Sequence, residues 1–185
     1  PADFVSGADN NQEQLKMDFP TTDAELAGNP NFVSGFPVGG WCRVYYNDFH
    51  GNKGHNDVFD GSGGRVGTTF PLDCRYNHFH GLTGDEHLDL DGDCYIAGNI
   101  LEHGTKDIWT SDSGYSNAIS TGGRGAGTTM MVARNLCFDM DHLLNCKAQV
   151  AGWVEHNTIA NLHADFHFSD SVYGIEQDVK CSVVN

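Results

Sequence analysis

The chain has 185 residues, of which 39% are hydrophobic and 23 are glycine, and its formal net charge at pH 7 is −15. This length and apolar content fit one folded domain and not a disordered chain, and the acidic excess disfavours nucleic acids and anionic membranes, which require clustered Lys or Arg. No apolar run reaches the roughly 18 residues that would predict a membrane-spanning helix.

The first 40 residues lack the pattern that fills the rest of the chain, and we expect them to form an irregular N-terminal cap. Residues 10–17 are predicted to form a short helical turn that ends before Pro20, and a second turn is predicted to begin near Thr22. A repeat protein needs such a cap because an open strand edge recruits other chains. The absence of an initiating methionine indicates a removed leader or a piece of a longer polypeptide.

From Trp41 onward an asparagine recurs in the same apolar setting, most clearly in residues 94–101 (CYIAGNIL). The five copies are Asn47, Asn77, Asn99, Asn135 and Asn157, at intervals of 30, 22, 36 and 22 residues. Each is followed by a second short strand-like segment, such as residues 87–90 (HLDL). Segments this short cannot bury a face alone and must stack on copies of themselves, so residues 41–185 are predicted to form an all-β solenoid.

We expect the asparagines to be structural. Asn tolerates the left-handed backbone conformation of a tight bend, and identical amides stacked at the strand spacing of about 4.8 Å can form a hydrogen-bonded ladder. The alternative is a row of ligand-binding amides. The flanking apolar residues and the recurrence of asparagine in every unit favour the ladder.

Residues 41–168 resemble extracellular right-handed parallel β-helix proteins of the pectin-lyase-like superfamily. The resemblance lies in the repeats, and it implies a right-handed parallel β-helix of about five coils. The similar lyases use calcium with a basic residue, and the similar hydrolases use paired aspartates with a Gly-His-Gly. Here the arginines are spread over the units and no Asp-Asp pair occurs, so both catalytic signatures are missing.

The strongest candidate site is the acidic run at residues 85–93 (DEHLDLDGD), in which Asp89, Asp91 and Asp93 alternate along a strand. Alternate side chains point to one side of a strand, and a hard cation takes six to eight oxygen ligands, so calcium is the expected ion. No helices flank the run, which is therefore not an EF-hand. A solvated acidic edge is the alternative.

Other side chains that could bind a metal ion or act in catalysis occur in pairs. His78 with His80, and His163 with His167, have spacings that place both rings on one strand face, which suits zinc or copper. No third ligand stands at a readable spacing, so surface or turn histidines are the favoured interpretation. Two carboxylate pairs, Asp57 with Asp60 and Asp89 with Asp91, have the chemistry of a glycosidase acid and base.

The chain has six cysteines, an even number without the paired spacing of a zinc site, and this predicts disulfides. They are Cys42, Cys74, Cys94, Cys137, Cys146 and Cys181. The expected bridges are Cys42–Cys74 and Cys137–Cys146, because only neighbouring levels of a solenoid bring Cα atoms within about 4.4–6.8 Å. Buried free thiols are the alternative. Disulfides, the missing initiator methionine and an acidic surface together predict an exported or cell-surface protein.

The sequence favours a module for extracellular assembly or adhesion. Such a module would bind other extracellular proteins or associate with itself through open strand edges at its ends, including as end-to-end filaments. The alternative is a polysaccharide lyase, a glycoside hydrolase or a glycan-binding module, with Trp41, Trp109 or Trp153 as a sugar platform. Calcium is the one cofactor that the sequence predicts.

Overall fold

The computed structural model describes residues 15–18, 42–51, 57–62, 72–105, 116–121, 128–146, 150–163, 166–168 and 180–184. All regular structure within these ranges is β-strand, and every strand pairing is parallel. The predicted all-β class with stacked parallel strands is therefore confirmed for the described part of the chain.

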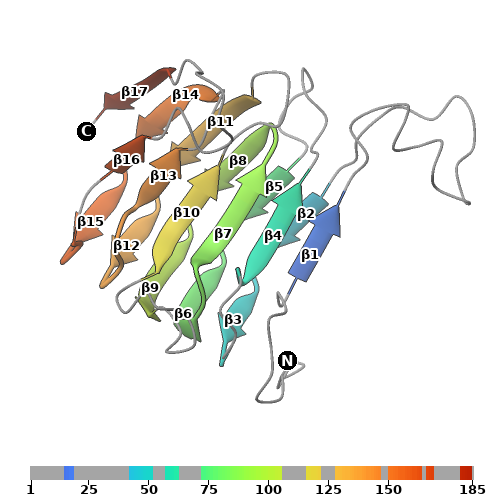
Figure 1. Cartoon of the computed structure of the whole chain (residues 1–185), viewed down its shortest axis with the longest axis vertical. Helices are drawn as coiled ribbons and strands as arrows, with labels where there is room; N and C mark the ends of the chain where they lie inside the picture. Colours follow the sequence, from blue (N-terminus) through green and yellow to red (C-terminus); the bar gives the residue numbers. More distant parts are fainter. Residues whose placement is uncertain are drawn as a thin grey trace, which may run out of the picture.

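The strands form three sheets (Figure 1). Sheet A contains, in order, β1 (Leu15–Asp18), β4 (Phe59–Ser62), β7 (Glu86–Asp91), β10 (Asn117–Thr121), β13 (Leu144–Cys146) and β16 (Phe166–Phe168). Sheet B contains β2 (Cys42–Tyr45), β5 (Leu72–Arg75), β8 (Cys94–Ala97), β11 (Thr128–Ala133), β14 (Val150–Glu155) and β17 (Lys180–Val184). Sheet C contains β3 (Asp48–His50), β6 (His78–Thr83), β9 (Ile100–Thr105), β12 (Leu136–Phe138) and β15 (Thr158–Ala160).

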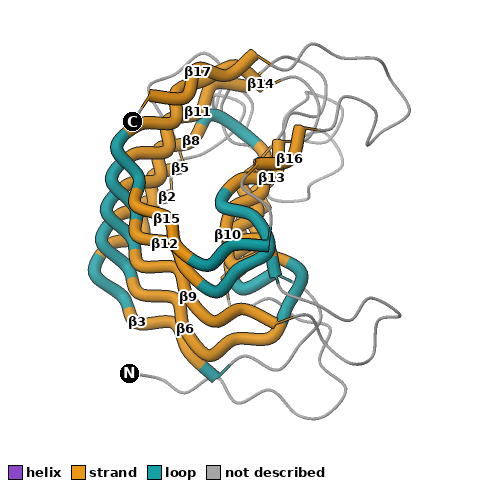
Figure 2. The backbone as a smooth tube through the Cα atoms, turned by 90° about the vertical axis from the view of Figure 1, so that its left-hand side faces the viewer, coloured by secondary structure: helices purple, strands orange, loops and turns teal. Residues whose placement is uncertain are grey.

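The chain passes through sheets B, C and A in a constant order, and we call each such pass a repeat. The strands β5, β6 and β7 of one repeat pair with β8, β9 and β10 of the next. Figure 2 shows the three sheets arranged around a common interior. This arrangement is consistent with a β-solenoid.

The sequence predicts a helical turn over residues 10–17, but residues 15–17 of this segment belong to the strand β1. Leu15 pairs with Phe59, and Met17 pairs with Gly61, at the end of sheet A. Main-chain pairing with β4 outweighs the weak helix preference of so short a segment, which cannot overcome the cost of helix nucleation alone. The second turn, near Thr22, lies outside the described residues.

The interior is filled by columns of side chains from equivalent positions of successive repeats. Alternation along each strand sends every second residue inward. In sheet B the innermost column is Val44, Cys74, Ile96, Val132 and Val154, all buried. In sheet C, Phe49 and Phe79 stack with ring centroids 4.5 Å apart. Regular apolar columns of this kind provide the stabilising burial that a single repeat lacks.

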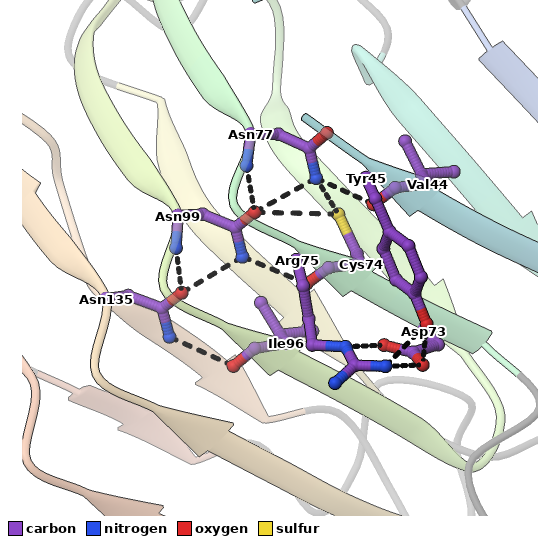
Figure 3. Close-up of polar contacts among 9 residues, drawn as sticks. All are labelled: Val44, Tyr45, Asp73, Cys74, Arg75, Asn77, Ile96, Asn99 and Asn135. Atoms are coloured by element: carbon purple, nitrogen blue, oxygen red, sulfur yellow. Dashed lines mark hydrogen bonds and ion pairs between the residues drawn. The ribbon is translucent and has the colours of Figure 1, made fainter. Parts of the chain in front are cut away.

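The asparagines lie in register at the bend between sheets B and C, and their amides form a continuous ladder. Figure 3 shows its middle part, formed by Asn77, Asn99 and Asn135. Oδ1 of Asn99 accepts hydrogen bonds from the backbone N–H of Asn77 at 2.9 Å and from its Nδ2 at 3.0 Å. Nδ2 of Asn99 donates to the carbonyl of Cys74 and to Oδ1 of Asn135, both at 3.0 Å. Equivalent bonds extend the ladder to Asn47 and to Asn157.

The left-handed residue of this bend precedes the asparagine. Positive φ values between 55° and 66° occur at Tyr46, Tyr76, Gly98, Arg134 and His156, whereas the ladder asparagines are not left-handed. The prediction that asparagine itself adopts this conformation is therefore wrong. Its position depends on the amide, which binds a backbone N–H and a carbonyl of the preceding repeat and the asparagine side chain of the next.

The predicted disulfides are absent. Cys42, Cys74, Cys94, Cys137 and Cys146 are buried free thiols. Cys42 pairs in register with Leu72, so Cys74 is its diagonal neighbour. Diagonal Cα atoms lie about 7–8 Å apart, beyond the reach of a bridge. Cys137 and Cys146 belong to different sheets, and the side chain of Cys181 lies outside the described part.

Replacing Asn99 with alanine should lower the free energy of unfolding by roughly 3–5 kcal/mol, because several buried donors and acceptors lose their partner at once. The matched control is Asn47→Ala at the exposed end of the ladder, which should cost below about 1 kcal/mol. Urea denaturation followed by circular dichroism measures both. Equal effects of the two substitutions would show that the buried ladder is not a main source of stability.

The thiols should be free but unreactive in the folded protein. Burial raises the pKa of Cys74, and it raises that of Cys137 to about 12, so little thiolate forms at pH 8. A colorimetric thiol assay should therefore give a slow reaction in native buffer and rapid titration of at least the five buried thiols after unfolding without reductant. Rapid native reaction, or fewer thiols after unfolding, would contradict this assignment.

Candidate functional site

The outer face of sheet B carries a hydrogen-bonded cluster of arginine, tyrosine and aspartate on β2 and β5 (Figure 3). The guanidinium of Arg75 contacts both carboxylate oxygens of Asp73 at 2.7 Å. Nη2 of Arg75 also donates to the hydroxyl of Tyr45 at 2.6 Å, and that hydroxyl hydrogen-bonds to Asp73. These hydrogen bonds raise the pKa of Arg75, so its charge is permanent.

The Arg75 guanidinium also lies between two aromatic rings. Its Cζ is 4.7 Å from the ring centroid of Tyr45 and 5.2 Å from that of Tyr95, on the two neighbouring strands. Both distances are within the range of a cation–π interaction. Charge, planar hydrogen-bonding groups and aromatic surface are thus held together in a fixed geometry.

Two further tyrosines stand at the left-handed bend beside this cluster. Tyr46 is 76% exposed and Tyr76 is 51% exposed, and their rings stack at 5.2 Å with an interplanar angle of 14°. The Tyr76 ring lies over Gly98, where a Cβ atom would come within 2.7 Å of it. Glycine at this position, with φ of +66°, therefore lets the exposed tyrosine pack against the next repeat.

We call this surface the tyrosine–arginine face. It comprises Arg43, Tyr45, Tyr46, Arg75, Tyr76, Tyr95, Arg134 and Trp153, the last in the same outward column as Tyr95 and 53% exposed. Three of the five arginines of the chain lie here, although the net charge is −15. These arginines are scattered along the sequence. However, each residue of the tyrosine–arginine face stands one, two or four residues before a ladder asparagine, and this offset is the sequence signal that predicts the face.

The fold brings the predicted carboxylate pair of Asp57 and Asp60 together, and it adds Asp89 from the predicted calcium set. Carboxylate oxygens of Asp57, Asp60 and Asp89 all lie within 4.8 Å of one another, with Asp60 and Asp89 paired in register on β4 and β7. Asp93 is buried, and its Oδ1 accepts a hydrogen bond from the backbone N–H of Thr129 at 2.7 Å. The side chain of Asp91 lies outside the described residues. Calcium binding at this run stays a prediction.

The structure brings one of the two predicted histidine pairs together. His78 and His80 face outward on β6, where Asp48 of the preceding repeat joins them. His163 is exposed in a bend, and the side chain of His167 lies outside the described residues. Trp41 and Trp109 also lie outside the described residues. Of the three candidate sugar platforms, the structure therefore describes Trp153.

One histidine that the sequence did not single out lies in the interior. His87 is 1% exposed, its ring centroid is 6.1 Å from that of Phe79, and neither of its ring nitrogens has a hydrogen-bond partner within the described ranges. A Cβ atom at Gly104 would lie 2.7 Å from its Nε2, so glycine provides room for the ring. Burial, with a smaller contribution from His80, lowers the pKa of His87 to about 3.

Comparison of the chain with protein-family models, with curated proteins and with solved structures finds no match. Among the described residues there is no helix long and apolar enough to cross a membrane.

His87 should make the folded protein sensitive to mild acid. Its pKa falls from 6.5 to about 3 on folding, so between these values the unfolded chain binds the proton and the folded chain does not. The free energy of unfolding should then fall as the pH falls, by up to about 1.4 kcal/mol per pH unit. A His87→Leu variant should lose about 2–3 kcal/mol less than wild type between pH 6.5 and pH 4.5 in urea denaturation.

The control for this experiment is His156→Asn, an exposed histidine at a left-handed bend that asparagine tolerates. It should retain the acid sensitivity of the wild type. Identical pH dependence of the His87→Leu variant and the wild type would contradict the assignment.

Proposed function

We propose that the chain is a right-handed parallel β-helix of about five coils that serves as an extracellular adhesion module and binds an extended anionic polysaccharide along its tyrosine–arginine face. Right-handed crossovers are nearly universal between parallel strands of one sheet, which supports the handedness. The free thiols remove the disulfide argument for export, so the extracellular assignment rests on the class of ligand.

The observation that carries this proposal is the concentration of exposed aromatic and arginine side chains on one face. Tyr, Trp and Arg are the residues that contribute most at binding surfaces, and large exposed aromatic side chains mark interaction sites. Tyr46, Tyr76 and Trp153 are each more than half exposed. Their rings offer flat apolar surface. The Arg75 guanidinium offers N–H donors to sugar hydroxyls and carboxylates, and the Asp73 carboxylate offers acceptors to sugar hydroxyls.

The charge and shape of the face favour an extended anionic ligand. Arg43 on β2 and Arg134 beside β11 are both exposed, and β2 is separated from β11 by β5 and β8. Neighbouring strands of a sheet lie about 4.8 Å apart, so these two cations are separated by roughly 14 Å in the direction in which the repeats stack. A polymer with repeated carboxylates can contact both, whereas the acidic remainder of the surface would repel it and so confine it to this row.

Isothermal titration calorimetry with polygalacturonate should detect binding that weakens as salt rises, and neutral dextran should bind at least about 10-fold more weakly. A Tyr46→Ala, Tyr76→Ala double variant should lose about 10-fold or more in affinity, and Arg134→Gln should also reduce the salt dependence. Leu136→Ala is the matched control, because Leu136 is an exposed apolar residue of sheet C, 37% exposed, and it should leave binding unchanged.

Absence of binding to polygalacturonate, or equal binding by the double variant, would overturn this proposal. Release of new reducing ends would instead favour a polysaccharide-active enzyme, with Asp57, Asp60 and Asp89 as its carboxylate set. These outcomes separate the adhesion module from the catalytic alternative in one set of samples.

A second candidate function is self-association through the open strand edges at the end of the stack, which is favoured by Ile159 on β15. This residue occupies the inward column of Phe79, Leu101 and Cys137, which are fully buried, yet it is 37% exposed. An exposed core position suits a second copy stacked on this end. Concentration-dependent oligomers that form without polysaccharide would favour it over the glycan-binding function.

A further inference from the structure

We propose that Asp48, His78 and His80 form a binding site for a divalent first-row transition metal ion, with zinc as the representative ion. The site lies on the outer face of sheet C and uses none of the residues of the tyrosine–arginine face. It therefore goes beyond the proposed function and is independent of it.

The fold places these three side chains on one surface. Asp48 on β3 is the register partner of His78 on β6, and the intervening Phe49 and Phe79 point inward and stack on each other. Because alternate residues point to opposite sides, Asp48, His78 and His80 share the outward side. The pair of strands is held in register by the ladder directly before it, through the backbone N–H of Asn47 and Oδ1 of Asn77 at 2.9 Å.

The potential ligand atoms are already close together. One carboxylate oxygen of Asp48 and one ring nitrogen from each histidine all lie within 4.8 Å of one another. Nε2 of His80 is 2.7 Å from Oδ1 of Asp48, and the two imidazole centroids are 4.2 Å apart. Ligands of a tetrahedral zinc ion are about 3.4 Å apart for metal–ligand bonds near 2.1 Å, so small side-chain rotations suffice.

The donor set indicates the class of ion. Two imidazoles and one carboxylate suit zinc and its first-row neighbours, whereas calcium and magnesium prefer sets made only of oxygen. Three protein ligands leave a further coordination position open to water or to a ligand from solution. The nearby ring of His50 stacks on His80 at 5.4 Å and limits the freedom of that imidazole.

A carboxylate on the neighbouring strand β9 provides the outer shell that such a site commonly has. Oε1 of Glu102 lies 2.5 Å from Nε2 of His78, and Oε2 of Glu102 lies 3.3 Å from Nε2 of His103. His103 in turn contacts Asp139 at 2.8 Å. A carboxylate that holds the second nitrogen of a ligating histidine orients the ring and increases its basicity. If these residues formed only surface ion pairs, the imidazoles of His78 and His80 would not need to lie with their centroids 4.2 Å apart.

Titration of the metal-free full chain with Zn²⁺ should show one site with affinity in the micromolar range or tighter, and Co²⁺ should give the visible absorption of nitrogen and oxygen ligation. His80→Asn and His78→Gln should each weaken binding at this site at least 100-fold. Asp48→Asn should weaken it about 10-fold or more, and Glu102→Gln, an outer-shell change, about 10-fold. His156→Asn, which removes an exposed histidine elsewhere, should leave affinity unchanged.

A second measurement on the unsubstituted chain makes the test independent of variant folding. In NMR spectra, Zn²⁺ should shift the imidazole resonances of His78 and His80 at one equivalent and leave those of His156 in place. Zinc binding that persists with both His78→Gln and His80→Asn, or shifts confined to other histidines, would overturn the proposal. So would the absence of any stoichiometric site.

Discussion

The asparagine ladder is the constraint on which the rest of the structure depends. In its buried middle, formed by Asn77, Asn99 and Asn135, Oδ1 of each amide accepts a hydrogen bond from a backbone N–H of the preceding repeat. Nδ2 donates to a carbonyl of that repeat and to the next asparagine. A slip of one residue would leave these groups unpaired and would turn the core columns outward. The ladder thus provides hydrogen-bond partners for the backbone groups of the bend, and it fixes the register of all three sheets together.

A fixed register distributes the chemistry of the chain over its faces. Residues just before each ladder asparagine form the tyrosine–arginine face, and residues just after it supply Asp48, His78 and His80. Segments farther along bring Asp60 and Asp89 of sheet A together with Asp57, which precedes β4. Repeat lengths from 22 to 36 residues do not disturb this order, because the extra residues lie between strands that keep their partners.

The repeated asparagines were sufficient to predict stacked parallel strands, because asparagine recurring in an apolar setting has few other structural uses. They could not reveal which residue is left-handed, since Tyr46 and Tyr76 rarely adopt that conformation and do so here where their rings stack. The surface clusters were hidden for a different reason. Asp48 stands 30 residues before its partner His78, so only the register of β3 with β6 shows that they meet.

The cysteines show how a compositional rule gives way to geometry. An even number of cysteines without the paired spacing of a zinc site predicts bridges, but Cys42 faces Leu72 and not Cys74 across the strand pair. An offset of two residues therefore decides between a disulfide and two buried thiols. The same offset places both sulfur atoms in the core, where they pack as small apolar groups.

The most direct test of the ladder is hydrogen exchange of the asparagine side-chain amides, followed residue by residue by NMR. The Nδ2 protons of Asn77, Asn99 and Asn135 should exchange as slowly as the backbone amides of the neighbouring strands, because each is buried and bonded to two repeats. Those of exposed Asn47 should exchange rapidly. Rapid exchange at all of these amides under native conditions would contradict a ladder that holds the repeats in register.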